Sequence, residues 1–493
     1  MIGCLLGAAI LLPILTGLFL LLFQDRIHNR KVKCIGIFLV MAVTSALAVK
    51  LMFAGNYEFV LWNLTDTLEI RVRMDDITRL FAGMTVAAWT LCGVFSFEYM
   101  RHEEHEDRYF GFYLIVMGVL IALDHAGNLI TLYLFFEMMT LTSLPLVLHN
   151  LSHEAVMAGL KYLFYSVAGA FMALFGIFYL YAHGVGRMFR EGGYLLVMDS
   201  YTGSHGMTLL VLMLTIVGFG TKAGMFPMHG WLPTAHPVAP APASAVLSGI
   251  ITKSGVLAII RVIFYVAGAD VIRGTWVQYA WMTLTLITVF MGSMMAYKEK
   301  GLKKRLAYST VSQVSYILFG LSVLNTDGMV GALSHFVFHS VVKNCLFLAA
   351  GVIIYKTGKK TVEELKGIGK EMPVTMWCFT LVSITLVGIP PTSGFVSKWY
   401  LATGSLKDGM GIYTWLGPVV LLLSAMLTAG YLLPISIQSF FPGEERRETG
   451  YQKREPNLLM LLPMLLFTAA AVLFGMFPGS FLSFLQTIAA GLL

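Results

Sequence analysis

The chain has 493 residues, of which 57% are hydrophobic and only 12% are charged, and its formal net charge is +7. A soluble domain carries about 25% charged residues, so this composition and the mean hydropathy of +0.76 exclude a soluble protein and indicate a polytopic membrane protein. The apolar runs lack the alternation of barrel strands, and peptide groups in hydrocarbon must be satisfied internally, so the spanning elements are predicted to be helices. Many of the basic residues gather in loops between these runs, so we expect a lipid-bilayer setting and no nucleic-acid partner.

The first apolar run, which begins near Ile2, lacks a basic leader and a small-residue cleavage site, so we expect a permanent helix. The five cysteines are scattered singly in apolar segments, with no C-x-x-C pair and no histidine at ligand spacing. We therefore expect no metal, no iron–sulfur cluster and no other cofactor in this chain.

Runs of about 20 apolar residues predict about fourteen transmembrane helices. They begin near Ile2, Val32, Asp75, Tyr109, Asn128, Ala158, Met207, Ala239, Trp276, Leu306, Met329, Pro373, Gly411 and Leu458. If the N-terminus is outside, the basic loops QDRIHNRKVK, KEKGLKKR, YKTGKKTVEELKGIGKEMP and GEERRETGYQKRE all lie inside, as the positive-inside rule requires. Both termini are then outside.

Two of these helices are predicted to be broken, the seventh at Pro227 and the twelfth at Pro390 and Pro391. Proline removes a backbone donor, and irregular backbone at membrane depth is tolerated only inside protein or beside a polar cavity. A simple proline kink is the alternative. We favour functional breaks because each has a lysine within about two turns, Lys222 before the first and Lys398 after the second.

The two breaks lie five helices apart, and five is odd, so a five-helix unit repeated in tandem would sit inverted in the membrane. Inverted repeats with broken helices in matching positions point to a transport path. The predicted organisation is helices 1–3 in residues 1–108, a first five-helix repeat (helices 4–8) in 109–274, a second (helices 9–13) in 275–440, and helix 14 in 441–493.

Several ionisable residues share the depth of the membrane centre. A charge there costs at least a few kcal/mol, so a group that persists usually faces a partner or a water path. The candidate residues are Glu137, Lys222, Lys253, His335, His339, Lys343 and Lys398. A carboxylate that only pins two helices together is the alternative for the first of them.

The spacing and chemistry of these residues favour proton transfer. His335, His339 and Lys343 are spaced i, i+4 and i+8, on one helix face, whereas a single histidine would be read as a core residue. Burial lowers the pKa of a lysine and a nearby carboxylate raises it again, so moving Glu137 relative to Lys222 would change the proton affinity of the lysine. Histidine titrates near neutral pH and passes a proton between its two nitrogens.

At these residues the sequence resembles the antiporter-like subunits of respiratory complex I and their relatives in multi-subunit (Mrp-type) Na+/H+ antiporters, membrane-bound hydrogenases and formate hydrogenlyase. The matching segments are FFEMMTLTSLPLVL, GTKAGMFPMHGWLPTAHPVAPAPASAVLSGIITKSG, KKRLAYSTVSQVSY, HFVFHSVVKNCLFLAAG and GIPPTSGFVSKW. The resemblance implies fourteen helices in two inverted five-helix repeats. It also implies these roles: Glu137 paired with Lys222, Lys253 as the bridging station, His335 and His339 as the connection, and Lys398 as the terminal station.

The resulting hypothesis is a proton-translocating subunit of an energy-converting complex in the inner membrane of a prokaryote, beside other antiporter-like and small membrane subunits. The chain would hold no redox centre itself and would belong to a proton-pumping oxidoreductase, NADH dehydrogenase-like or hydrogenase-like, with a peripheral redox arm in partner subunits. Which complex it serves, the stoichiometry and the direction of flow stay open.

Two alternatives remain at this point. One is a subunit of a Na+/H+ antiporter that exchanges cations without redox chemistry; because lysines do not coordinate sodium, its ligands would have to be Glu137 and, nearer the helix ends, Asp75, Asp76 and Asp124. The other is a non-transporting scaffold or quinone-binding subunit, which would not need a charged row at mid-membrane.

Overall fold

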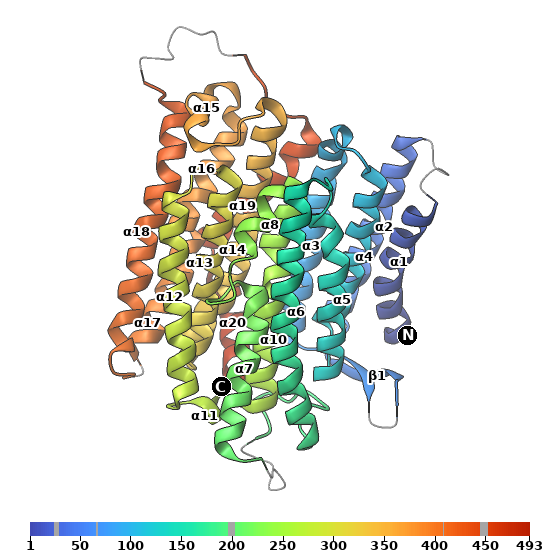
Figure 1. The fold of residues 1–493 in the computed structure, drawn as a ribbon, viewed down its shortest axis with the longest axis vertical. Coiled ribbons are helices and arrows are strands. Elements are labelled where there is room, and N and C mark those ends of the chain that lie inside the picture. The colour runs from blue at the N-terminus through green and yellow to red at the C-terminus, as the bar shows by residue number, and fades with distance from the viewer. Residues whose placement is uncertain (24–28, 66–67, 196–202, 408, 444–451) are drawn as a thin grey trace.

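In a computed structural model the chain folds into a bundle of long helices that run along one common axis (Figure 1). The structure describes residues 1–23, 29–65, 68–195, 203–407, 409–443 and 452–493. Among the described residues, eleven helices are long and apolar enough to cross a membrane. The chain is therefore a multi-pass helical membrane protein, as predicted, while the count of fourteen and the inverted repeats stay predictions.

Long helices follow one another along the chain, joined by short segments. Up to the first break the elements are α1 (Ile2–Leu22), α2 (Arg30–Met52), β1 (Tyr57–Asn63), β2 (Glu69–Met74), α3 (Asp76–Tyr99), η2 (Met100–His102), α4 (Glu106–Asp124), α5 (Leu129–Val147), α6 (His153–Ala182) and α7 (His205–Ala223). They continue with α8 (Leu232–Val238), α9 (Ala241–Val246), η3 (Leu247–Ile251), α10 (Thr252–Ile260), η4 (Arg261–Ala267), α11 (Ala269–Ile272), α12 (Trp276–Lys298), α13 (Leu302–Ser322) and α14 (Thr326–Thr357). The last are η5 (Val362–Leu365), α15 (Ile368–Glu371), α16 (Pro373–Val387), α17 (Ser393–Lys407), α18 (Tyr413–Phe440), α19 (Leu458–Met476) and α20 (Gly479–Leu492).

The helical path is interrupted at both predicted breaks. α7 ends at Ala223 and is followed by Gly224 at φ +77°, and α16 ends at Val387 and is followed by Gly388 at φ +89°. Glycine adopts this left-handed conformation without a steric penalty, so both half-helices end in the usual way. The chain then restarts as α8 and as α17.

Two further irregularities were not predicted. The eighth predicted span contains two π-helical segments, η3 and η4, on either side of α10. The fourteenth predicted helix is in fact two, because α19 ends at Met476 and α20 begins after Pro478, a residue that lacks the backbone donor needed to continue a helix.

A two-stranded antiparallel hairpin, β1 and β2, lies between α2 and α3 and was also not predicted. The segment Glu69–Met74 alternates charged and apolar residues, and Ile70, Val72 and Met74 turn their side chains into the bundle. The backbone of β2 bonds the turn between α4 and α5, through Arg73 N to His125 O and Gly127 N to Arg71 O. The alternation was the available signal for a strand.

The two chain termini lie in the same half of the bundle as the hairpin, and α15 lies at the opposite end (Figure 1). Residues 24–28 and 444–451, which belong to two of the basic loops used to orient the chain, lie outside the described residues. The orientation in the membrane therefore stays a prediction.

Small residues set how closely the first helix packs on the rest of the bundle. A Cβ atom added at Gly118 of α4 would lie 2.4 Å from the carbonyl oxygen of Ile10 and 2.6 Å from Cγ1 of Ile14, both in α1. At Gly7 of α1 an added Cβ would meet nothing within 4 Å. The α1–α4 contact therefore depends on the missing side chain at Gly118, as is common between membrane helices.

We predict that Gly118→Ala destabilises the protein by about 1–3 kcal/mol, because the added methyl group overpacks the α1–α4 contact. The matched variant Gly7→Ala should be neutral or slightly stabilising, since alanine favours a helix over glycine. The thermal unfolding midpoint in detergent measures both, and equal midpoints for the two variants would contradict this account of the packing.

Candidate functional site

Lys222 lies in the last turn of α7, and its side chain is 2% exposed. Its Nζ donates hydrogen bonds to Thr140 Oγ1 (2.8 Å), to the Tyr162 hydroxyl (2.6 Å) and to Ser166 Oγ (3.3 Å). The same ammonium group lies 4.3 Å from the centre of the Tyr162 ring. Three hydroxyl groups of α5 and α6 therefore take the three N–H donors of this lysine.

Glu137 lies one turn before Thr140 on α5, half-buried, and its buried Oε1 atom has no hydrogen-bond partner. Lys222 acts electrostatically on this carboxyl group. Among the described residues, however, no ion pair joins Glu137 to Lys222, whose donors are occupied by the hydroxyls. The pairing implied by the resemblance is therefore not a direct contact in this structure.

Lys253 lies on α10, which packs tightly on α7. A Cβ atom added at Gly255 would lie 2.5 Å from Phe219 O and 3.2 Å from Lys222 Cβ. The side chain of Lys253 is 1% exposed, and Nζ donates to the carbonyl oxygen of Ser248 in η3. π-Helical turns occur frequently at functional sites, and here one lies directly before the buried lysine.

His335 and His339 lie on one face of α14, with stacked rings whose centres are 5.9 Å apart. His335 Nδ1 bonds Ser397 Oγ of α17 at 2.9 Å, while its Nε2 and both ring nitrogens of His339 have no hydrogen-bond partner among the described residues. The charges of Lys253, Lys343 and Lys398 all act on His339. The bond to Ser397 places His335 against α17.

Lys343 completes the same face of α14 and is fully buried. Its Nζ donates to Leu306 O (2.9 Å) and Ser309 Oγ (2.7 Å) of α13. Like Lys222 and Lys253, it bonds neutral oxygens.

Lys398 lies on α17, after the second break, and Nζ donates to the carbonyl oxygens of Leu386 (2.7 Å) and Val387 (2.8 Å). These are the last two residues of α16, so the cation lies at the negative end of a half-helix. The side chain also lines a cavity of about 240 Å³ between α16, α17 and α18. Pro390 and Pro391 lie in the short connection that brings the two half-helices together.

The first break is stabilised differently. Pro227 lies in the connection between α7 and α8, and there Trp231 Nε1 donates to Thr221 O (2.8 Å) while Phe226 N donates to Thr288 Oγ1 (2.9 Å). Backbone groups released by the break thus find side-chain partners inside the bundle, as irregular backbone at membrane depth requires.

Comparison with known proteins identifies the family. The model of the NADH:quinone oxidoreductase/Mrp antiporter transmembrane family matches residues 126–428, well over half of the chain. The chain belongs to this family. The matched region contains Glu137, the lysines, the histidines and both breaks.

Two relatives and one solved structure agree with this assignment. NADH-quinone oxidoreductase subunit N of Desulforudis audaxviator is 32% identical over 390 residues, which cover 76% of this chain and 75% of the relative. A Na(+)/H(+) antiporter subunit of Bacillus subtilis is 28% identical over 474 residues, covering 95% of this chain and 92% of the relative. A chain in the structure of the Mrp complex from Dietzia sp. DQ12-45-1b is similar with a TM-score of 0.85 at 21% identity, covering 100% of this chain and 97% of that one.

His236 lies in the region matched by the family model, but it was not among the candidate residues predicted from the sequence. It is fully buried in α8, both ring nitrogens lack hydrogen-bond partners among the described residues, and the charges of Lys253, Lys303 and Lys343 act on it. The signal was its place as the second histidine of the MHGWLPTAH segment.

Of the carboxylates considered for a sodium site, Asp75, Asp76 and Asp124 have other partners, whereas Oε1 of Glu137 has none among the described residues. Asp75 forms a buried ion pair with Arg261 (Nη1 to Oδ2, 2.5 Å) and also contacts Arg73 Nε at 3.0 Å. Asp124 accepts a hydrogen bond from Thr85 Oγ1 at 2.8 Å. Because Asp75 and Arg261 are 186 residues apart in the chain, no local sequence signal could have joined them.

We predict that Asp75→Asn destabilises the protein by about 3–5 kcal/mol, because it leaves the buried Arg261 guanidinium without a counter-charge. The neighbouring Asp76 pairs with Arg79 at the surface, so Asp76→Asn should cost about 0–1 kcal/mol. Thermal unfolding of the two purified variants tests this, and similar losses would show that the buried pair is not a main contributor to stability.

Proposed function

We propose that this chain is a proton-translocating subunit of a multi-subunit energy-converting membrane complex in a prokaryote, and that protons move along the row from Glu137 to Lys398. The observation that carries the proposal is the state of the buried lysines. Lys222, Lys253 and Lys343 are buried in a membrane bundle, and their ammonium groups bond hydroxyl and carbonyl oxygens. A structural cation at this depth would be expected to contact a carboxylate.

Lys222 and Glu137 act as an electrostatic switch in this proposal. The carboxyl group has a free acceptor, Oε1, and the ammonium group is held by hydroxyls that a small movement of α5 against α7 would exchange for the carboxylate. Closing the pair favours the protonated lysine, and opening it favours release of the proton toward Lys253.

The histidines carry the proton between the two halves of the row. His335 and His339 together present three ring nitrogens without protein partners, and buried polar groups in native proteins are normally satisfied. Ordered water is the partner that this site can take, and a histidine–water chain conducts protons. Ser397, bonded to His335, lies one residue before Lys398 and leads the chain to the terminal station.

The proposed row reaches the surface of the bundle at both ends. Glu137 lies beside Leu134, Met138 and Leu141, which are 37%, 36% and 58% exposed, and Lys398 lines the cavity described above. We infer that neighbouring antiporter-like or small membrane subunits cover these two places. Mrp and complex I neighbours of this fold are parts of such assemblies, and a peripheral redox arm or a cation gradient would drive the cycle.

The organisation expected from the sequence belongs to the same proposal. Residues 109–274 and 275–440 would form two inverted five-helix repeats, with Lys222 and Lys398 at their broken helices. Both termini would lie outside the inner membrane, opposite the basic loops.

We expect Lys222→Ala and Glu137→Ala each to lower proton uptake by roughly two orders of magnitude, the effect of removing a positioned proton-transfer group. Uptake is measured in inverted membrane vesicles that contain the whole complex, at verified equal assembly. The control removes the same two charges from an exposed ion pair, Lys300 and Glu363, by Lys300→Ala and Glu363→Ala, and should leave uptake unchanged.

Unchanged uptake in the Lys222 and Glu137 variants would make the charged row structural and overturn the proposal. The same vesicles, assayed with and without sodium, separate the Na+/H+ exchange alternative. Proton movement that requires sodium would favour exchange, and sodium-independent movement favours the proton path proposed here.

A further inference from the structure

Two adjoining cavities at one end of the bundle are not part of the proposed row. One is a polar cavity of about 330 Å³, lined by residues that include Tyr99, Glu103, Lys303 and Lys360. The other is a groove of about 680 Å³ between α6 and α8. Pro237, Val238 and Lys304 line both, so the two cavities adjoin at these residues.

The groove is mostly apolar and lies on the outer surface of the bundle. Its α6 wall carries Met157, Leu160 and Phe164, which are 53%, 55% and 71% exposed, and its α8 wall carries Pro233 and Val238. In a membrane protein such a surface faces hydrocarbon, so the shape and chemistry of the groove suit an acyl chain.

Two cations, Lys161 and Lys304, and one carboxylate, Glu154, line this mostly apolar groove. Lys161 is eight residues past the start of α6, about 12 Å along the helix. Among the described residues it makes no hydrogen bond or ion pair through its side chain. A lysine leans toward the N-terminal end of its helix and extends its ammonium group toward the membrane surface. A charge beside hydrocarbon needs a counter-charge. Glu154 lines the same groove, but among the described residues no carboxylate forms an ion pair with Lys161.

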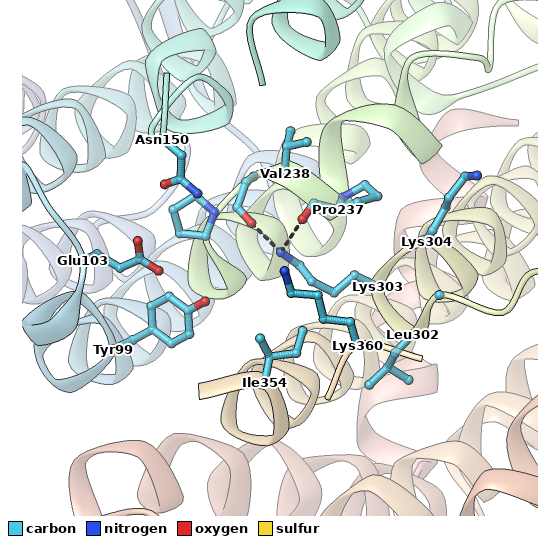
Figure 2. Close-up of a pocket in the computed structure, with 13 residues that line it drawn as sticks. Tyr99, Glu103, Asn150, Pro237, Val238, Leu302, Lys303, Lys304, Ile354 and Lys360 are labelled. Carbon is cyan, nitrogen blue, oxygen red and sulfur yellow. Dashed lines mark hydrogen bonds between the residues drawn. The ribbon is translucent and has the colours of Figure 1, made fainter. Parts of the chain in front are cut away.

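The polar cavity presents more positive charge at the same end of the bundle. Figure 2 shows the ammonium groups of Lys303 and Lys360 side by side, facing a wall formed by Tyr99, Glu103 and Asn150. Lys303 Nζ donates to the carbonyl oxygens of Pro237 (3.2 Å) and Ala239, and the side chain of Lys360 has no partner among the described residues. Burial raises the pKa of the Glu103 carboxyl group, and among the described residues this group forms no ion pair with Lys303 or Lys360.

Lys304 joins the two cavities chemically as well as spatially. It lines both, and its ammonium group pairs with Glu299 at 3.0 Å at the rim. A phosphate near Lys304 would therefore lie between the apolar groove and the polar cavity, at the level where a headgroup meets its acyl chains.

We propose that the groove and the polar cavity together bind one anionic glycerophospholipid. An acyl chain lies along Leu160 and Phe164, the phosphate lies between Lys161 and Lys304, and the rest of the headgroup reaches Lys303 and Lys360. Basic pockets between helices on the cytoplasmic side are typical sites for anionic headgroups. A free phosphate would satisfy the lysines but would leave the groove without an occupant. The site does not depend on the proposed transport function.

Native mass spectrometry of the full chain in detergent tests the proposal with phosphatidylglycerol and phosphatidylethanolamine of identical acyl chains. Each lysine near an anionic headgroup contributes about a fivefold change in affinity. Lys161→Gln and Lys360→Gln should each weaken phosphatidylglycerol binding about fivefold and leave phosphatidylethanolamine unchanged. Lys300→Gln, which removes an exposed lysine at the same end of the bundle but outside both cavities, should change neither.

A second variant separates the possible occupants. Leu160→Trp fills the groove without changing charge and should reduce phosphatidylglycerol binding, and inorganic phosphate should not displace the lipid. Displacement by inorganic phosphate would show a simple anion site, and equal losses in Lys300→Gln would show only surface charge; either result overturns the proposal. A third result would also overturn the proposal: a Leu160→Trp variant that still binds phosphatidylglycerol but no longer assembles with partner subunits. The groove would then be a binding site for a partner subunit.

Discussion

The central constraint on this structure is that an ammonium group in a membrane interior must be stabilised without being fixed by a carboxylate. Full neutralisation by a contacting carboxylate would hold the proton on the lysine, whereas no partner at all would make burial too costly. Lys222 satisfies the constraint with three hydroxyls, and Lys253 and Lys398 satisfy it with backbone carbonyls. Dipoles of this kind lower the cost of the charge yet leave its proton exchangeable.

This constraint explains the irregular backbone beside Lys253 and Lys398; Lys343, on the unbroken α14, instead bonds Leu306 O and Ser309 Oγ near the start of α13. A regular α-helix uses its carbonyl groups within the helix, so it has few to offer a buried cation. The break after Val387 ends α16 and directs its last carbonyls toward Lys398, and the π-helical segment η3 provides Ser248 O for Lys253. At the first break the free carbonyl oxygen bonds another side chain in place of a lysine: Trp231 Nε1 donates to Thr221 O. At Lys253 and Lys398, irregular backbone therefore supplies the carbonyl oxygens that stabilise the buried ammonium group.

The same reasoning explains what the sequence could predict. Spans and breaks are signalled locally, by hydropathy and by proline, so both could be predicted; Lys222 and Lys398 are visible in the sequence as charges in apolar runs, and their roles stay predictions. The hairpin was missed although its alternation at Glu69–Met74 was visible, because short strands compete poorly with fourteen long apolar runs. Two features could not be predicted: the absence of an ion pair between Glu137 and Lys222, and the ion pair between Asp75 and Arg261. Both depend on contacts between helices far apart in the chain, for which a single sequence carries no signal.

The contrast between Arg261 and the lysines separates structural charge from exchangeable charge. A guanidinium stays protonated under all relevant conditions, so Arg261 serves no proton relay, and it contacts a carboxylate directly through Asp75. The lysines can lose a proton when buried, and their partners are neutral oxygens. Among the described residues, the buried Arg261 thus contacts a carboxylate, whereas Lys222, Lys253, Lys343 and Lys398 bond neutral oxygens. This division favours a path for protons over a purely structural role. Lysines with a purely structural role would be expected to contact carboxylates, as Arg261 does.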